Sequence, residues 1–462
     1  MTHPLSPSLQ QGLPGRAIGR LPSGATSRPA GTSSAGDRFQ AALAMLHTGH
    51  GDAMAAADAL VQDHPSFAGG HCLRWALLVM AARDGAMADL ARALRAGRTV
   101  RNADARARRH FDAAAAWLAR DLRGALDAYG AIVADHPDDT LALRVAQFGD
   151  LQWGRTESLR SRVAAVLPHW NPDMPGYGHV LGMYAFGLAE MGDAVRAEQV
   201  GRSALACTPG NAAAIHAVAH AFEMQGRAAD GIAWLKQTAA QWTVSSYAIH
   251  LWWHLALFHL DLGDVGMALS ILDGRIRANP DADAATLVDA SSLLWRLQLL
   301  GIDTAGRWQT VADAWTARPL DGLRPFNDTH AMLAFVGAHR PGSAATLMTQ
   351  LRASATRTRD LGRAVYQAAL PVCAALIRFG RGDYNGAADR LLRHRRLTER
   401  CGGSHAQCDL LHLTLLESAL RSGQADLSRE LSRERVHLRP HSRLNAQLVT
   451  RARGVAQSLL AA

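Results

Sequence analysis

The 462-residue chain is long enough for two or three average domains or for one extended array of repeats. Alanine and leucine dominate an apolar fraction of 48%, and aromatic residues make up only 6%, a balance that favours helix over sheet. No window approaches eighteen uninterrupted apolar residues, so the sequence predicts no membrane-spanning helix.

The formal net charge of +9 comes from the C-terminal quarter of the chain. Residues 351–462 contain 19 arginines and 9 acidic residues. The arginines are scattered along expected helix faces, and no nucleic-acid-binding motif accompanies them. We therefore interpret them as a solvated surface and do not expect a nucleic-acid partner.

Five cysteines form no C-x-x-C pair, so we expect neither a disulfide framework nor a cysteine zinc site, and a reducing compartment fits best. The N-terminus lacks the apolar segment of a secretory signal. Residues 1–36 contain no acidic residue and are rich in Ser, Gly and Pro, which predicts a disordered basic leader, with a transit peptide as the alternative. The sequence thus predicts a cytoplasmic protein with one folded region at 37–462.

From Asp37 onward, apolar residues recur at the three- and four-residue spacing of amphipathic helices. Gly and Pro interrupt them in a fixed order: a first helix ends at a glycine step, and a proline stops the second helix. In chain order, this template fits residues 51–65, 122–137, 192–209 and 263–280. Further helix pairs are expected around 382–383 and 423–440, whereas the sections 65–105 and 285–325 fit the period poorly.

Small residues mark the points where paired helices cross. They fall at Ala197, Gly231 and Ala268, at intervals of 34 and 37 residues, and 34 is the tetratricopeptide period. One helix pair cannot bury its own apolar face, so the pairs must stack on one another. The predicted fold class is therefore all-α: an α-solenoid (superhelix) of tetratricopeptide-like antiparallel helix pairs, with the best-formed repeats at about 178–281.

Two pairs of histidines with i, i+4 spacing fall within these repeats, His216/His220 and His250/His254. Side chains four residues apart share one helix face, so each pair could bind one ligand or one metal ion. In the repeat that begins at residue 212, His216, His220 and Glu223 occupy positions 5, 9 and 12, the stripe that lines the concave groove of tetratricopeptide repeats.

The neighbouring repeats add side chains to the same predicted groove. His179 falls at position 2 of the preceding repeat, and His250 and Trp253 fall at positions 2 and 5 of the following one. Each histidine taken alone could equally satisfy a buried backbone group or cap a helix. Because the set shares one stripe, we favour a functional groove over a purely structural one.

The H-E-x-x-H signature of zinc proteases is absent, because alanine follows His216. No general base is therefore built into that helix. Glu223, three residues beyond His220, could serve as metal ligand, as base or as a partner that orients a ligand.

Five segments resemble the tetratricopeptide repeat protein 38 family, whose role is poorly characterised. They are GHVLGM at 178–183, HAVAHAFEMQGR at 216–227, HLWWHLAL at 250–257, FNDTHAM at 326–332 and GGSHAQ at 402–407. The resemblance runs from about residue 40 to the C-terminus. It implies that Asp328, His330 and His405 join the site, which a curled solenoid would allow. Cys408 departs from the family, where arginine is expected, and this puts in doubt a cation beside His405.

Two functions remain open at this point. In the first, the concave groove binds a small molecule or a peptide partner, with Phe186 and Trp253 providing apolar area and the histidines and Glu223 providing polarity. His179, Asp328, His330 and His405 would also contact the ligand.

In the second, the protein is an enzyme of unknown reaction. His216, His220, Glu223, His250 and His254 would then supply acid–base groups, with a divalent metal ion on the four histidines as the candidate cofactor. No nucleophile motif, phosphate loop or dinucleotide fingerprint is present to name the reaction. The oligomeric state, a homo-oligomer included, is also left open.

Overall fold

The computed structural model describes residues 33–81, 86–276, 278–318, 324–357, 360–398 and 402–460. Most of these residues are helical, and no strand occurs among them. The described helices all belong to one unit, which spans Ala35–Ala462. The predicted leader at 1–36 lies outside the described residues except for its last four positions. None of the described helices is both long and apolar enough to cross a membrane.

Helices follow one another along the chain with short connections. The N-terminal elements are α1 (Ala35–Thr48), α2 (Ala53–Asp63), α3 (Ala68–Ala81), α4 (Ala86–Arg98), α5 (Ala105–Leu118), α6 (Leu122–Asp135), α7 (Thr140–Gln152), α8 (Thr156–Val166) and the 3₁₀ turn η2 (Leu167–His169). The central elements are α9 (Tyr177–Glu190), α10 (Ala194–Cys207), α11 (Ala212–Gln225), α12 (Ala228–Gln237), α13 (Ala239–Trp242), α14 (Ala248–Asp261), α15 (Val265–Ile271), η3 (Leu272–Ile276), α16 (Ala284–Leu299) and α17 (Ala305–Thr316). The C-terminal elements are α18 (Pro325–Gly337), α19 (Pro341–Arg357), α20 (Asp360–Gly380), α21 (Tyr384–Arg393), α22 (Arg395–Thr398), α23 (His405–Arg421), α24 (Ala425–Leu438) and α25 (Arg443–Leu460).

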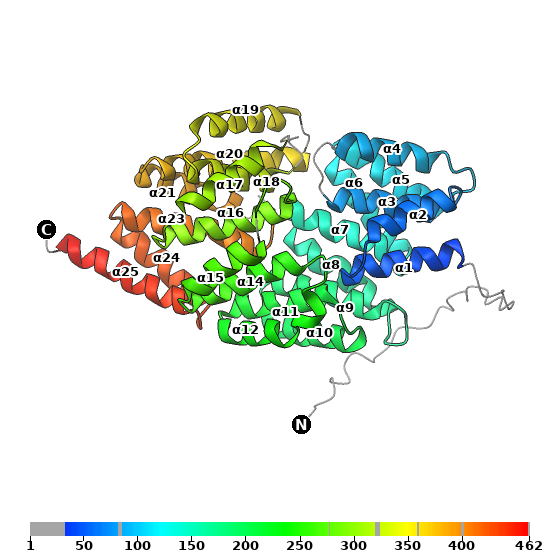
Figure 1. The fold of residues 1–462 in the computed structure, drawn as a ribbon, viewed down its shortest axis with the longest axis horizontal. Helices are drawn as coiled ribbons and strands as arrows, with labels where there is room; N and C mark the ends of the chain where they lie inside the picture. Colours follow the sequence, from blue (N-terminus) through cyan, green and yellow to red (C-terminus); the bar gives the residue numbers. More distant parts are fainter. Residues whose placement is uncertain are drawn as a thin grey trace, which may run out of the picture. The chain divides into compact units, whose positions relative to one another are not determined.

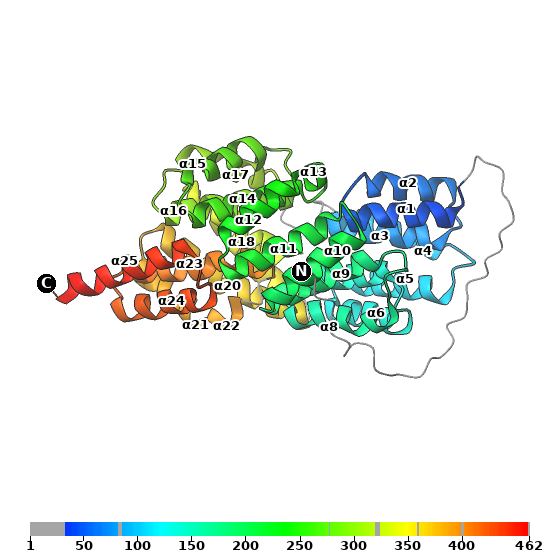
Figure 2. The same ribbon diagram turned by 90° about the horizontal axis from the view of Figure 1, so that it is seen from below.

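In most pairs the first helix packs against the second helix of its own pair and against the first helix of the next pair. In the centre of the chain, α9 contacts both α10 and α11, and α14 contacts both α15 and α16. Figure 1 and, turned by 90°, Figure 2 show these pairs lying side by side in chain order. The fold is an α-solenoid of tetratricopeptide-like antiparallel helix pairs, as predicted. The sections 65–105 and 285–325, which fit the period poorly, contain the pairs α3/α4 and α16/α17.

The recurring Gly-Asp steps have a clear structural role. Gly51, Gly263 and Gly382 adopt left-handed backbone conformations with φ of 80°, 85° and 78°, which glycine reaches without steric cost and which end the first helix. The aspartate that follows each glycine caps the second helix by accepting a hydrogen bond from a backbone N–H three residues further on. One dipeptide thus ends one helix and starts the next.

Small residues allow the paired helices to approach closely. Ala197, Ala219 and Ala268 are fully buried at the crossing points. At Gly231 an added Cβ would lie 2.5 Å from the ring of Phe258, well inside contact distance. The crossing residues predicted from the period are therefore the positions with no room for a larger side chain.

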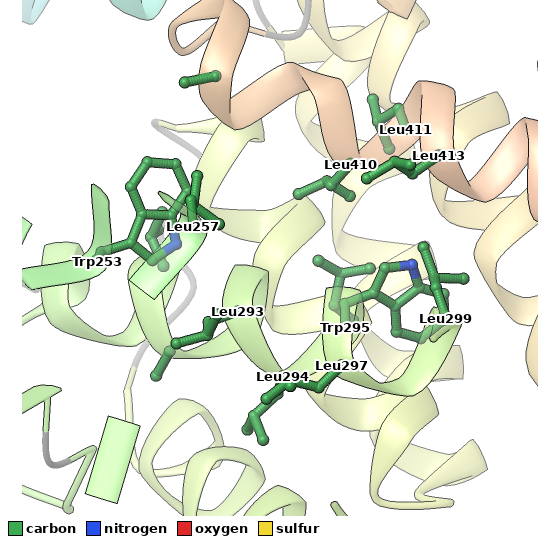
Figure 3. Close-up of a cluster of buried hydrophobic side chains, with 14 of the residues drawn as sticks. Trp253, Leu257, Leu293, Leu294, Trp295, Leu297, Leu299, Leu410, Leu411 and Leu413 are labelled. Atoms are coloured by element: carbon green, nitrogen blue, oxygen red, sulfur yellow. The ribbon is translucent and has the colours of Figure 1, made fainter. Parts of the chain in front are cut away.

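The largest apolar core joins the central repeats to the C-terminal ones. Figure 3 shows Trp253 and Leu257 of α14, five residues of α16 and three leucines of α23 in one cluster of buried side chains. Within it, the indole N–H of Trp295 donates a hydrogen bond to the hydroxyl of Thr414 at 2.9 Å. First helices from repeats more than 100 residues apart are thereby held against each other, and the site depends on this arrangement.

Candidate metal centre and its cavity

Two adjacent first helices, α11 and α14, bring four histidines together. Asn211 caps α11 by accepting a hydrogen bond from the N–H of Ala214. The ring centroids of His220 and His254 lie 4.6 Å apart, and those of His216 and His250 lie 4.9 Å apart. The two i, i+4 pairs predicted from the sequence therefore face each other across the contact between the helices.

One ring nitrogen from each of the four histidines lies within 4.8 Å of the corresponding atoms of the other three. The closest measured pair is Nε2 of His216 and Nε2 of His220, at 2.9 Å. Nitrogen atoms that converge in this way can share one metal ion, because metal–nitrogen bonds are about 2.0–2.1 Å long. The four histidines thus form one cluster. They are not spread along the groove, the arrangement that would suit docking alone.

Carboxylates contact the other ring nitrogen of two of these histidines. Glu190 Oε1 lies 3.1 Å from Nδ1 of His220, and both oxygens of Asp289 lie 3.0 Å from Nδ1 of His250. Glu190 and Asp289 are buried, with 1% and 2% of their surface exposed. Because Nδ1 of each ring faces its carboxylate, Nε2 lies on the opposite side of the ring. A carboxylate behind each imidazole is the arrangement that orients histidine ligands at metal sites.

The third carboxylate belongs to Glu223, which the sequence placed on the same stripe. Its Oε2 lies 3.4 Å from Nδ1 of His254, and its Oε1 lies 3.5 Å from the guanidinium of Arg439. That contact lacks the geometry of a hydrogen bond, so neither ring nitrogen of the fully buried His254 has a hydrogen-bond partner among the described residues. A buried polar atom without a partner is costly and points to a ligand in the functional state.

The electrostatics favour neutral imidazoles and a charged carboxylate. Burial, followed by the neighbouring histidines, holds the pKa of His216 and of His254 well below 6.5. Burial by itself would raise the pKa of Glu190, but the contacts with His220 and His405 outweigh it and leave that pKa below its usual value. The rings of His216 and His254 are therefore unprotonated near neutral pH, the state in which imidazole binds metal.

His216 and His250 are only half-buried, and both line a cavity of about 280 Å³. Its wall is formed by first helices from many repeats, since α3, α7, α9, α11, α14, α16, α18 and α23 all contribute. The remaining polar lining residues are Arg144, Gln147, Gln152, Tyr247, Asp283, Arg324, Asn327, Ser404 and Gln407, besides His220 and Asp289. A small molecule in this cavity would lie next to the histidine cluster.

The two predicted aromatic residues have different roles. Phe186 lines the cavity and stacks on His216, with ring centroids 5.6 Å apart and an angle of 26° between the planes. Trp253 is fully buried and stacks on His250, with centroids 5.1 Å apart and an angle of 12°. Trp253 therefore supports a histidine from behind and offers no surface to a ligand.

His179 lies apart from the cluster. It stacks on His47, with centroids 5.1 Å apart, and both line a separate cavity of about 840 Å³ near α1, α3, α5 and α7. Burial and the charge of Arg144 lower the pKa of His179 to about 4. The residues predicted to form one stripe across three repeats therefore line two separate cavities.

The three residues implied by the family resemblance lie around the site rather than in it. Asp328 and His330 are buried in α18, where Nδ1 of His330 donates a hydrogen bond to the carbonyl of Phe326 at 2.9 Å. His405 lines another cavity, of about 300 Å³, but its backbone N–H donates to Glu190 at 2.8 Å. Ser404 caps α23 in a capping box, with Gln407 as its second member.

Sequence reasoning missed Glu190 and Asp289. A signal for Glu190 exists, because Glu190-Met191 and Glu223-Met224 are the same dipeptide 33 residues apart, at equivalent places near the ends of α9 and α11. No such signal marks Asp289, which lies in the section that fits the repeat poorly.

No family model matches the chain. Among solved structures, the chain is similar to the anaphase-promoting-complex hetero-tetramer Cut9-Hcn1, with 14% identity over 89% of this chain and 69% of that one and a TM-score of 0.45. It is also similar to a tetratricopeptide repeat protein from Parabacteroides merdae, with 14% identity over 62% of this chain and 98% of that one and a TM-score of 0.33. A third is the human IFIT1 dimer with m7Gppp-AAAA, with 12% identity over 91% and 94% of the two chains and a TM-score of 0.41.

Proposed function

We propose that this protein is a metalloprotein in which His216, His220, His250 and His254 hold one divalent transition-metal ion at the wall of a cavity that receives a small molecule. The observation that carries the proposal is the convergence of four ring nitrogens within 4.8 Å. Imidazole donors suit zinc, iron, copper and nickel. An ion held there would act as a Lewis acid on an oxygen of the bound molecule.

Two features distinguish this reading from histidines that merely fill a core. Three of the four rings have a carboxylate at Nδ1, an arrangement that packing alone does not require. In addition, Nε2 of the fully buried His254 has no hydrogen-bond partner among the described residues, and a metal ion would satisfy it.

A small molecule fits the site better than a peptide. The cavity of about 280 Å³ is near the lower end of the size range of small-molecule sites. The peptide-docking hypothesis required Trp253 as an exposed anchor, but Trp253 is fully buried.

We also propose that the chain is a member of the tetratricopeptide repeat protein 38 family. Four of the cavity-lining residues, Phe326, Asn327, Ser404 and Gln407, come from two of the segments that carry the resemblance. Segments that lie far apart in the sequence would thus share one site, which supports reading them as parts of one motif.

Elemental analysis tests whether the protein binds a metal ion. Purified protein, incubated with Zn²⁺ or Fe²⁺ and then dialysed, is expected to retain about one ion per chain. His220→Ala and His250→Ala should each lose the ion, because each removes one of four donors.

The matched control is His437→Ala, which changes an exposed histidine on α24 and should leave the metal content unchanged. His250 is half-buried, so its variant should remain folded even if the fully buried His220 proves necessary for stability. A folded wild-type protein that retains no ion after incubation with Zn²⁺ or Fe²⁺, or with Cu²⁺ or Ni²⁺ in the same way, would refute the proposal.

A further inference from the structure

One cation in the cavity wall has no acidic partner. Arg144 lies on α7, and its guanidinium donates a hydrogen bond to the phenol oxygen of Tyr247 at 2.6 Å. Its Nε is buried and has no hydrogen-bond partner, and no acidic side chain in the described part of the chain forms an ion pair with it. Arg162 and Arg435, which also have little exposed surface, are paired with Asp150 at 2.6 Å and with Asp409 at 2.7 Å, whereas the buried Arg296 donates to Ser292 and to the carbonyl of Ala406.

The cavity also contains two acidic residues, and neither forms an ion pair with Arg144. Asp283 caps α16 by accepting a hydrogen bond from the N–H of Thr286 at 2.8 Å. Asp289 contacts Nδ1 of His250. A second arginine, Arg324, lines the same cavity with its guanidinium over the ring of Phe148. With a dication on the histidines, the ion and the two arginines would outweigh the charges of Asp283 and Asp289 in the cavity lining.

Tyr247 adds a hydrogen-bond donor at the same place. Its ring lies 5.5 Å from that of His216, and its oxygen accepts the hydrogen bond from Arg144. The phenol hydrogen is then directed away from the guanidinium. Arg144 and Tyr247 together present N–H and O–H donors on the side of the cavity next to His216, which suits oxygen acceptors that carry negative charge.

Resting on the proposed metal centre, we infer that the bound molecule is a small organic oxyanion, a carboxylate or a phosphate, whose charged group lies between the metal ion and the Arg144–Tyr247 pair. The planar guanidinium fork matches both groups, and the metal ion supplies the second positive contact. Arg144 is thus the residue that selects an anion among the small molecules that could enter.

Calorimetric titration with two simple probes, acetate and inorganic phosphate, tests the inference. Metal-loaded wild-type protein is expected to bind at least one of them, and the tighter of the two identifies the class of anion. Arg144→Gln should weaken that binding tenfold or more while the metal content stays at the wild-type value, and Arg144→Lys, which keeps the charge but loses the fork, should fall between the two.

Arg352→Gln, an exposed change on α19, serves as the matched control and should bind like the wild type. If Arg144→Gln retains both metal and wild-type anion binding, or if folded, metal-loaded wild-type protein binds neither probe, the inference is overturned while the metal centre stands. If the wild type binds no metal, the metal centre fails. The same titration is then made on metal-free wild type and on metal-free Arg144→Gln. If the two proteins bind the anion equally, the inference fails together with the metal centre.

Discussion

Glu190 connects two distant parts of the chain through one carboxylate. One oxygen contacts His220, and the other accepts a hydrogen bond from the backbone N–H of His405. The side chain is almost fully buried and has a lowered pKa, so it carries a negative charge next to the histidine cluster. Its charge would orient His220 and raise the donor strength of that ring.

Replacing that charge should weaken metal binding without removing a ligand. Glu190→Gln keeps the shape of the side chain, and we expect the affinity for Zn²⁺ to fall by about 10- to 100-fold, the usual effect of losing such a partner. A competition titration with a chromophoric chelator measures the change. Glu198→Gln, on the neighbouring helix α10, should behave like the wild type, and equal affinities for both variants would contradict the role of Glu190.

At the residue scale, the sequence predicted the four histidines but not their surroundings. The i, i+4 spacing determines which side chains share a helix face, and this is sufficient for His216, His220, His250 and His254. It does not determine how far a helix turns against its neighbours. Trp253 consequently points into the core that α14 shares with α16 and α23 instead of into the groove (Figure 3).

At the scale of elements, close helix crossings fix the spacing of the repeats. Gly187 on α9 is the tightest example, because a Cβ there would lie 2.7 Å from both the Cα of Arg160 and the carbonyl oxygen of Leu159 on α8. These are backbone atoms, which cannot rotate aside as a side chain can. The two helices can approach this closely only with glycine at position 187.

Gly187→Ala should therefore destabilise the protein by about 1–3 kcal/mol, the usual cost of overpacking. Gly306→Ala on α17 provides the contrast, because nothing lies within 4 Å of its added Cβ. There, replacing a helical glycine should stabilise by about 0.5–1 kcal/mol. Urea unfolding of both variants gives the two free energies, and losses of equal size would show that helix propensity, not contact between α8 and α9, governs position 187.

Element positions were largely predictable from the sequence, and for a physical reason. Where its glycine adopts a left-handed conformation, a Gly-Asp step ends one helix and can cap the next, as at Gly263-Asp264, whereas Gly149-Asp150 lies inside α7. The pairs α3/α4 and α16/α17 lack such a step at their turns, so periodicity alone could not place them. Asp289, the carboxylate behind His250, lies in α16, and the sequence analysis missed it because that helix could not be placed in the repeat.

At the scale of the whole molecule, buried neutral histidines link stability to pH. Burial, followed by His179 and Arg144, holds the pKa of His47 well below 6.5. Burial also lowers the pKa of His179 and that of His330, both to about 4. In the unfolded chain these groups titrate near 6.5. Below that pH the unfolded state takes up protons that the folded state does not, so stability is full above pH 6.5 and declines as the pH falls below it.

We expect the metal-free protein to lose on the order of 3 kcal/mol of unfolding free energy between pH 7 and pH 5.5 from these three groups together. Urea unfolding at a series of pH values measures the slope. His437→Ala, which changes an exposed residue, should leave that slope unaltered. A free energy that stays constant over this range would show that the three rings are protonated in the folded state.

The contact between Glu190 and His405 also has a consequence for how the protein is made. The amide that holds the carboxylate behind His220 comes from a residue 215 positions later in the chain. Once the ribosome has synthesised the central repeats, all four histidines can already lie on folded helices. The amide of His405 has not yet been made at that stage. The metal affinity of the site would then reach its full value only when the chain is nearly finished, and an early-terminated chain would bind the ion more weakly.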